Sequence, residues 1–294
     1  MLPIGRVTWS VGGFHTVLTE DGGLMSCAAR GRLKRSHGEI IVGDFVSYGE
    51  EQQGAVIDAI NPRRHYLPRP LVANVDQAAL IFACHEPQPS LLLIDRFILA
   101  LFTASLPLFI CFNKADLVSP STADKLAGYY RDLGFDVLIT STKNHLGRNK
   151  LLARLYGRTT VFCGPSGAGK SALMNMLVPG IHLATGDLSK KISRGRHTTR
   201  AVRLIPIKRS GFIVDTPGYT QVDLAGINRR QLAGYFPEFV EHGGLCYFKT
   251  CLHLSEPGCS IKQAVADGQI RETRYLHYCS IMQELLVASQ KQDR

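Results

Sequence analysis

Gly164-Pro-Ser-Gly-Ala-Gly-Lys-Ser171 is the stretch of sequence on which the fold assignment depends. The apolar, β-prone run Thr159-Thr-Val-Phe-Cys163 precedes it, and the helix-forming run from Ala172 to Leu177 follows it. A glycine-rich loop between a strand and a helix is the context in which such a motif binds phosphate. The segment therefore predicts a P-loop in an α/β domain with a doubly wound sheet.

Each residue type in this loop has a physical role. Gly164, Gly167 and Gly169 allow backbone N–H groups to turn toward phosphate oxygens at a helix N-terminus, where the helix dipole also favours negative charge. Lys170 would reach the β- and γ-phosphates, and Ser171 would bind Mg²⁺. The alternative is a glycine-rich turn with an incidental Lys-Ser pair, and the flanking strand and helix patterns disfavour it.

A second apolar run, Gly211 to Val214, predicts a buried strand that brings Asp215 to its C-terminal end. This is the edge at which open α/β sheets bind ligands. Asp215 would hold Mg²⁺ through water, and the Gly218 N–H would contact the γ-phosphate. Alone, Asp215-Thr-Pro-Gly218 is an ordinary turn, and it gains meaning because a P-loop precedes it.

A guanine-recognition signature follows another expected strand. The strand is Leu108 to Phe112, and the polar residues after it are Asn113, Lys114 and Asp116. The Asp116 carboxylate can accept hydrogen bonds from both N1–H and the 2-amino group of guanine, whereas adenine offers no matching pair of donors. Ser141 is expected to complete the base pocket with its backbone N–H, and Lys143 is the alternative. The expected ligands are GTP and GDP, so a P-loop kinase or ATPase is disfavoured.

The order of these motifs along the chain is permuted. Residues 113–116 precede the P-loop, whereas ordinary GTPases place this signature downstream of it. Loops at the C-terminal ends of parallel strands meet in space whatever the chain order. A permuted chain is therefore expected to assemble the same nucleotide pocket.

Four potential metal ligands lie close together near the C-terminus. They are Cys246, Cys251, His253 and Cys259, with the spacing C-x4-C-x-H-x5-C. Three thiolates and one imidazole form a closed set of four ligands, which is typical of structural Zn²⁺. The alternative is disulfide bonds beside a surface histidine. Because no signal peptide is recognisable, a reducing cytosol is expected, where such clusters more often bind metal.

Size and charge limit the remaining possibilities. A chain of 294 residues with 45% hydrophobic residues fits two or three globular domains. No run of about eighteen apolar residues occurs, so no membrane span is expected. The net charge is +10, and residues 141–210 contain fourteen Lys or Arg residues against one acidic residue, Asp187. This excess predicts a polyphosphate partner, nucleic acid in particular, and a solubilising basic loop is the alternative.

The first 70 residues have a different pattern. Short β-prone runs alternate with glycine-containing turns at residues 5–9, 14–18, 39–42, 45–48 and 55–58. Five such runs predict a small barrel of OB-fold size. Its basic loop residues, Arg30, Arg32, Lys34 and Arg35, would suit nucleic-acid binding, and a barrel that serves only for packing is the alternative.

Over nearly its whole length the chain resembles the RsgA (YjeQ) family, circularly permuted GTPases that assist assembly of the small ribosomal subunit. The segments that carry the resemblance are Arg30-Gly-Arg-Leu-Lys34 with Gly43-Asp44, Arg69-Pro70 with Ala73-Asn-Val-Asp-Gln77, Asp95-Arg96, residues 113–116, residues 164–171, Gly195-Arg-His-Thr-Thr199, residues 215–218 and residues 246–259. The resemblance implies an OB-fold RNA-binding domain over residues 1–68, a permuted GTPase domain over residues 69–230 and a helical zinc-binding domain over residues 231–294.

The resemblance also implies partners and a location. It implies a cytoplasmic bacterial factor that binds the small ribosomal subunit and its rRNA, and whose GTP hydrolysis is stimulated there. The cofactors implied are Mg²⁺ and one structural zinc ion. We expect a monomer.

The catalytic residues are marked less directly. In many GTPases a glutamine directly after Asp-x-x-Gly orients the attacking water, but Tyr219 occupies that position. Because a tyrosine hydroxyl cannot reproduce the paired contacts of an amide, slow intrinsic turnover is predicted. The catalytic candidates are Lys170, His197 and Thr199. The family is similar in carrying a histidine at the position of His197, which would approach the water; an exposed residue or an RNA contact is the alternative. Thr199, rather than Thr198, would bind Mg²⁺.

Two functions of different classes follow from these expectations. The first is a ribosome-stimulated GTPase that assists late maturation of the small (30S) subunit. The second is an rRNA-binding assembly scaffold, in which the nucleotide is structural and its turnover incidental.

Overall fold

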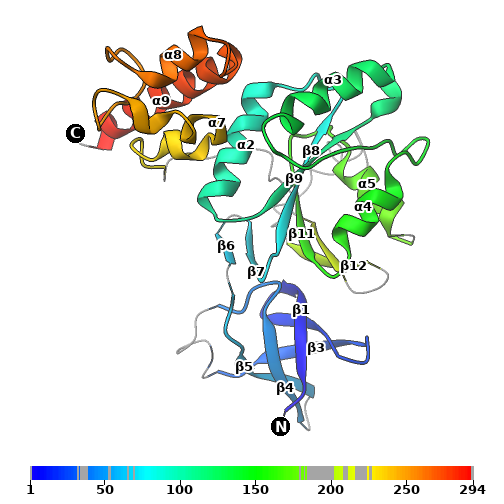
Figure 1. The fold of residues 1–294 in the computed structure, drawn as a ribbon. Helices are drawn as coiled ribbons and strands as arrows, with labels where there is room; N and C mark the ends of the chain where they lie inside the picture. Colours follow the sequence, from blue (N-terminus) through cyan, green and yellow to red (C-terminus); the bar gives the residue numbers. More distant parts are fainter. Residues whose placement is uncertain are drawn as a thin grey trace.

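The chain forms three units in the computed structural model (Figure 1). A β-barrel at the N-terminus is followed by an α/β unit around a central sheet and by a group of helices at the C-terminus. The structure describes residues 2–31, 33, 39–51, 54–64, 66–68, 70–178, 180–181, 183, 202–207, 211–215, 224 and 227–292. Among these residues, every helix is too short or too polar to span a lipid bilayer.

The barrel is closed and has five strands, as the sequence predicts. They are β1 (Ile4–Val11), β2 (Phe14–Leu18), β3 (Leu24–Ala29), β4 (Phe45–Glu51) and β5 (Gly54–Ile60), and they close in the order β1-β2-β3-β5-β4. Val7, Val17, Val46 and Ile57 are fully buried inside it. In β2 and β4 the buried residues alternate with less buried ones, as the pleat of a strand requires, whereas β1 has four consecutive buried residues.

The strand expected at residues 39–42 is wrong. Ile41 and Val42 are buried, but they lie in a connection outside the barrel ladder. The Ile41 N–H donates to the Asp44 carboxylate at 2.9 Å, and the Val42 carbonyl accepts from the Ala73 N–H at 2.8 Å. The missing strand is β3, whose sequence Leu-Met-Ser-Cys-Ala-Ala contains no β-branched residue. Residues 40–42 are apolar because Ile40 packs in the core of the barrel and Val42 in the core of the α/β unit, whereas Glu39 is exposed. Composition alone does not distinguish a buried connection from a strand.

A short hairpin, β6 (Tyr66–Pro68) and β7 (Leu71–Ala73), connects the barrel to a six-stranded sheet. The strands of the sheet are β8 (Gln77–Ala83), β9 (Leu108–Asn113), β10 (Val137–Ile139), β11 (Thr159–Cys163), β12 (Arg203–Ile207) and β13 (Gly211–Asp215). Their spatial order is β10-β9-β8-β11-β13-β12, and every neighbouring pair is parallel except β12 with β13. The sheet is thus the predicted doubly wound type.

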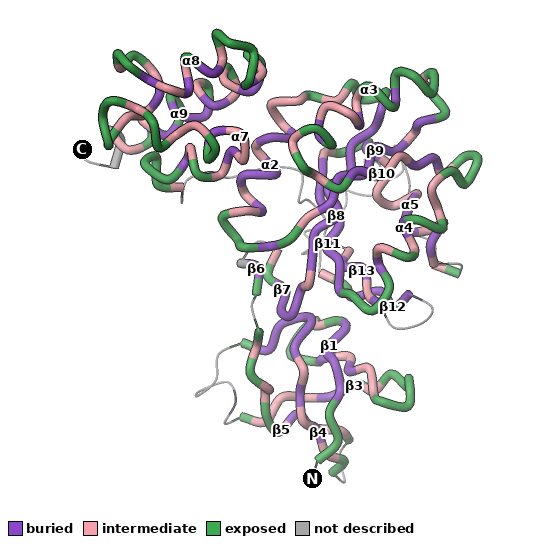
Figure 2. The backbone as a smooth tube through the Cα atoms, viewed as in Figure 1, coloured by how far each residue is buried: buried purple, intermediate pink, exposed green. Residues whose placement is uncertain are grey.

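Helices cover both faces of this sheet. On one face, α2 (Leu91–Thr103) and α3 (Pro120–Arg131) pack against Leu80 and Phe82 of β8. On the other face, α4 (Arg148–Leu155) and α5 (Lys170–Leu177) pack against Ala79 and Ile81 of the same strand. The central strands are buried on both sides (Figure 2), which explains their continuous apolar runs.

The C-terminal unit consists of short helices and one long helix. They are η2 (Leu232–Tyr235), α7 (Pro237–Val240), η3 (Gly243–Leu245), α8 (Ser260–Ala266) and α9 (Glu272–Gln292). Phe236, Phe239 and Tyr278 lie in its core, together with Leu99 of α2. The unit is therefore packed on the α/β unit through α2 (Figure 1).

Candidate functional site

The structure brings the predicted nucleotide-binding segments to one edge of the sheet. The P-loop leaves β11, residues 113–116 leave β9 through the turn η1 (Ala115–Leu117), and Asp215 ends β13. In the sheet, β11 lies next to β13 and is separated from β9 only by β8. Their C-terminal ends lie together because all four strands are parallel. The permuted chain thus assembles a single site from three separate segments.

Two glycines of the P-loop are required by close packing. Gly164 has φ +133°, and a Cβ atom there would lie 2.0 Å from the Ile81 carbonyl oxygen of β8. Gly169 has φ +92°, and a Cβ atom there would lie 2.3 Å from Nδ2 of Asn113. The loop is therefore pressed against both the central strand and the guanine-recognition segment, where only glycine fits.

We expect Gly169→Ala to weaken GTP binding about tenfold or more, because the new methyl group must displace Asn113 and the backbone conformation disfavours a side chain. Nucleotide titration with a fluorescent GTP analogue would measure the loss. Gly157→Ala is the matched control, since Gly157 also has positive φ, +69°, but has no atom within 4 Å of the added methyl group. Equal GTP affinity of the Gly169 variant and the native protein would contradict the packing argument.

Lys170 and Asp215 are the oppositely charged residues of the predicted phosphate site. The Lys170 ammonium donates to the carbonyl oxygens of Gly164 at 2.7 Å and Pro165 at 2.8 Å. Burial lowers the pKa of Lys170, and burial raises the pKa of Asp215, against the opposing charges of Arg203 and Lys170. Both groups are partly removed from water. A phosphate would therefore interact strongly with Lys170, and Mg²⁺ would interact strongly with Asp215. Ser171 is half-buried at the second residue of α5.

Asn113 connects the guanine signature to the P-loop. Its side chain is fully buried, and Nδ2 donates to the Ala168 carbonyl at 3.0 Å. Oδ1 accepts from the hydroxyl of Thr140 at 3.2 Å, at the end of β10. The orientation of the amide is thereby fixed from both sides. Thr140 was not predicted as a site residue, although its place at a strand end beside Ser141 is a usable signal.

Ser141 contacts Asp116 through its side chain and not through its backbone. The Ser141 hydroxyl donates to Oδ1 of Asp116 at 2.5 Å, and Asp116 itself is exposed. The Ser141 backbone N–H, expected to face the base, donates to the Leu146 carbonyl at 3.1 Å. The Lys143 N–H donates to the Ser141 hydroxyl oxygen at 3.2 Å. Both expected donors are therefore engaged within the protein, and Ser141 orients the Asp116 carboxylate.

A further segment of the site, residues 84–89, was not predicted. The Cys84 N–H donates to the Asn113 carbonyl at 2.7 Å, and the Glu86 carbonyl accepts from Nζ of Lys114 at 2.5 Å. A Cβ atom on Gly167 would lie 3.3 Å from Cδ of Pro87, so this segment also reaches the P-loop. It follows β8, the strand between β9 and β11. The rule that ligands bind at strand C-termini would have indicated it.

Several predicted residues lie outside the part of the chain that the structure describes. They are His197, Thr198, Thr199, Gly218 and Tyr219. The same holds for most of the basic residues that were expected to bind nucleic acid. They are Arg32, Lys34 and Arg35 in the barrel loop and most of the Lys and Arg residues between positions 190 and 209. In these two basic segments, Arg30 and Arg203 are described and contact other side chains. Arg30 pairs with Glu51 and Asp58, and Arg203 lies over the ring of Trp9.

The four predicted metal ligands converge in the C-terminal unit. The ligand atoms of Cys246, Cys251, His253 and Cys259 all lie within 4.8 Å of one another. Nδ1 of His253 lies 3.5 Å from Sγ of Cys246 and 3.4 Å from Sγ of Cys259. Such spacings fit one tetrahedral ion with bonds of about 2.0–2.3 Å. Burial lowers the pKa of His253, which favours the neutral imidazole that binds metal.

Side chains around this cluster hold the loop that carries His253. The Glu256 carboxylate accepts from the N–H groups of Leu252 at 2.8 Å and Leu254 at 2.9 Å. On the other side, the hydroxyls of Tyr275 and Tyr278 in α9 donate to the carbonyls of His253 at 2.8 Å and Leu252 at 2.9 Å. His253 has φ 58°, which these contacts stabilise. The four potential ligands are thus held in an arrangement compatible with zinc, and their loop is linked directly to α9.

Protein-family models match most of the chain. One described as RsgA GTPase matches residues 60–225, and one described as RsgA N-terminal domain matches residues 4–57. The first covers the sheet with its three site segments, and the second covers the barrel. Together they assign the same two units that the structure separates.

Similar proteins and solved structures extend over nearly the full length. The chain is 39% identical to the small ribosomal subunit biogenesis GTPase RsgA of Alkaliphilus metalliredigens over 96% of this chain and 97% of that protein. It is 41% identical to the protein of the same name from Carboxydothermus hydrogenoformans, over 96% of this chain and 97% of that protein. The crystal structure of YjeQ from Thermotoga maritima has a TM-score of 0.82 at 32% identity, covering 97% of this chain and 99% of that one. YloQ, described as a circularly permuted GTPase, has a TM-score of 0.79 at 34% identity, covering 97% and 95% of the two chains.

Proposed function

The chain belongs to the RsgA family of GTPases, and we propose on this premise that it hydrolyses GTP to GDP and phosphate on the small ribosomal subunit during late maturation of that particle. The relatives named above are small ribosomal subunit biogenesis GTPases. The observation that supports hydrolysis by this chain is the convergence of residues 113–116, the P-loop and Asp215 at one sheet edge, with Asn113 bonded directly to the P-loop. A scaffold that binds RNA alone would not require this arrangement, whereas a scaffold with a structural nucleotide would, so GTP turnover distinguishes the two functions.

The nucleotide would be held by two groups of residues. Asn113, Lys114, Asp116 and Ser141 form the base site, with Asp116 oriented by the Ser141 hydroxyl. Gly164, Gly167, Gly169, Lys170 and Ser171 form the phosphate site, together with Gly218 and Asp215. Lys170 would move from the loop carbonyls to the phosphates, which offer its ammonium a full opposite charge.

Mg²⁺ is the cofactor that GTPases of this kind use, and when bound it neutralises charge that develops on the phosphates. Ser171, Asp215 and Thr199 are the residues that we assign to it. His197 remains our candidate for the residue that orients the attacking water. The usual glutamine is absent, because Tyr219 occupies its position directly after Gly218. Slow turnover of the isolated protein follows from this assignment.

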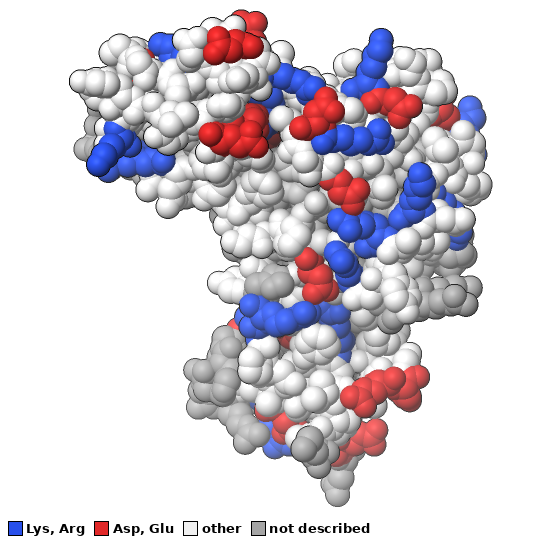
Figure 3. Space-filling view, in the orientation of Figure 1, with Lys and Arg blue, Asp and Glu red and all other residues white. Residues whose placement is uncertain are grey.

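The remaining parts of the proposal concern domains, partners and location. We propose an RNA-binding barrel over residues 1–68, the GTPase domain over residues 69–230 and a zinc-binding domain with one structural ion over residues 231–294. Lys and Arg side chains gather at the junction of barrel and α/β unit and along the α/β unit beside it (Figure 3), which would suit the phosphates of rRNA. We further propose a monomer that acts in the cytoplasm.

Purified small subunits are expected to raise GTP turnover on the order of tenfold or more over that of the isolated protein. Phosphate release at about 50 mM and 200 mM salt would measure this, and the stimulation should fall steeply at the higher concentration because rRNA contacts release counterions. Lys170→Ala should abolish turnover in both conditions. Turnover that small subunits leave unchanged would contradict the proposal. If the folded Lys170 variant still supported subunit assembly, the scaffold function would be favoured.

A further inference from the structure

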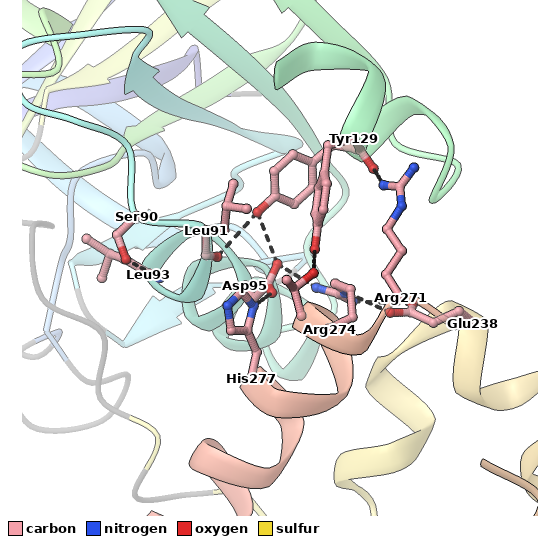
Figure 4. A network of polar contacts seen from close by, with 11 residues as sticks. Ser90, Leu91, Leu93, Asp95, Tyr129, Glu238, Arg271, Arg274 and His277 are labelled. Carbon is pink, nitrogen blue, oxygen red and sulfur yellow. Dashed lines mark hydrogen bonds and ion pairs between the residues drawn. The ribbon is translucent and has the colours of Figure 1, made fainter. Parts of the chain in front are cut away.

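A buried carboxylate, Asp95, joins the GTPase domain to the C-terminal unit (Figure 4). Asp95 lies on α2, with a side chain that is 1% exposed. Its Oδ1 lies 2.5 Å from the Arg274 guanidinium, and its Oδ2 lies 2.5 Å from Nδ1 of His277, both on α9. The Tyr130 hydroxyl of α3 donates to Oδ1 at 3.2 Å. One side chain thus contacts two helices besides its own.

Arg274 continues this network into the C-terminal unit. Its side chain is 2% exposed, and Nε donates to the Glu238 carboxylate of α7 at 2.5 Å. Its guanidinium also lies over the ring of Phe236, 4.6 Å from the ring centre. Separating a buried arginine from one of its two carboxylate partners costs free energy, because an uncompensated charge then remains out of water. The relative position of α2 and α9 is therefore strongly specified.

The N-terminal end of α2, close to Asp95, follows a segment that contacts the proposed nucleotide site. The helix begins at Ser90, whose hydroxyl accepts from the Leu93 N–H at 3.3 Å. Asp95 is about 7.5 Å along the axis from Ser90, at a rise of about 1.5 Å per residue. The preceding segment, residues 84–89, contacts Asn113, Lys114 and the P-loop glycine Gly167. A short rigid element therefore connects the buried network to both nucleotide-binding motifs.

We propose that Asp95 is a positioning residue for the nucleotide site: by fixing α2 against α9, it holds residues 84–89 against Lys114 and Gly167. The C-terminal unit then sets nucleotide affinity without contacting the nucleotide. This inference rests on the proposed function, because it takes residues 113–116 and 164–171 as the guanine nucleotide site. The connection passes through described residues and does not use the segment after Asp215.

Coupling of this kind is reciprocal. If the position of α9 changes nucleotide affinity, nucleotide binding must also change the stability of the α2–α9 contact. We expect GDP to slow hydrogen exchange of backbone amides in residues 272–285, which are remote in sequence from the nucleotide motifs. A residue that only stabilised the fold would not transmit a nucleotide-dependent difference to these amides.

Asp95→Asn tests the inference in the full-length protein, because it keeps the shape of the side chain and removes its charge. We expect GDP affinity, measured with a fluorescent GDP analogue, to fall about five- to tenfold. We also expect the GDP-dependent change in exchange over residues 272–285 to disappear. A folded variant with native GDP affinity and a native exchange difference would overturn the inference.

Glu284→Gln is the matched control. It removes an ion pair between the same two helices, Arg96 with Glu284, but the Glu284 side chain is 48% exposed and contributes little in water. Its GDP affinity should stay within about twofold of native. An equal loss in this variant would show general loosening of the two helices and overturn the specific role of Asp95.

A milder variant covers the case in which Asp95→Asn does not fold. Tyr130→Phe removes the hydroxyl that donates to Asp95 and to the Leu91 carbonyl at 3.3 Å. A smaller loss of GDP affinity, with a reduced exchange difference, would support the inference, and native values for both would overturn it. If the native protein itself binds no guanine nucleotide, the proposed function fails, which is a separate outcome.

Discussion

Asp116→Asn is expected to reduce GTP affinity about 100-fold, which corresponds to roughly 3 kcal/mol for a lost charge-assisted hydrogen bond and a mismatched donor. Guanine presents two donors, N1–H and the 2-amino group, to the two carboxylate oxygens. Asparagine offers one oxygen and one NH₂ group, so its NH₂ would face the 2-amino group. The same variant should gain affinity for xanthosine triphosphate, because xanthine has a carbonyl oxygen at C2 that accepts from this NH₂. Competition titrations with both nucleotides would measure the change.

Asp116→Asn should change the base contact without disturbing the surrounding structure. Asp116 is exposed, and its protein partner is the Ser141 hydroxyl, which can donate or accept and therefore tolerates an amide. Asp124→Asn is the control, since Asp124 is exposed on α3 and pairs only loosely with Arg131 at 3.7 Å. It should leave both affinities native. If Asp116→Asn bound GTP as tightly as the native protein, the guanine site would have to lie elsewhere.

The sequence predicts that the three motif segments converge, because the motifs coincide with strand ends. Residues 108–112, 159–163 and 211–214 were expected as strands and are found within β9, β11 and β13. Parallel pairing then places the following loops at one edge, so the permuted order does not matter. The clustering of the four potential metal ligands was predictable for a similar reason, since four residues within a span of fourteen have few ways to lie far apart.

Features that depend on distant partners were not predictable in this way. Residues 40–42 have strand-like composition because they are buried, with Ile40 in the core of the barrel and Val42 in that of the α/β unit. In the sequence, Asp95 is a charged residue within an apolar helix. Its ion pair with Arg274, which lies 179 positions later in the chain and 2.5 Å away, is visible only in the structure. Contacts between segments far apart in the sequence, and not a local pattern, decide both features.

Removal of the metal is expected to unfold the C-terminal unit while the barrel and the sheet stay folded. That unit spans only residues 227–292, and its loop of residues 246–259 has little regular structure, so packing alone provides limited stability. A structural zinc ion contributes about 10–16 kcal/mol in comparable peptides. Cys259→Ser should therefore abolish metal content and expose α9. Elemental analysis and hydrogen exchange of residues 260–292 would measure both changes.

Cys279→Ser is the matched control, because it removes a cysteine that is not one of the four potential metal ligands. Cys279 lies on α9, half-buried and outside the four-residue cluster, so its replacement should leave metal content native. Because Tyr275 and Tyr278 of α9 bond to the loop that carries His253, unfolding of the metal loop should propagate into α9 and release Arg274 from Asp95. Chelation should then weaken GDP binding in the same direction as Asp95→Asn. A protein that carries zinc, loses it to a chelator and keeps native exchange over residues 260–292 would show that the ion does not support this fold.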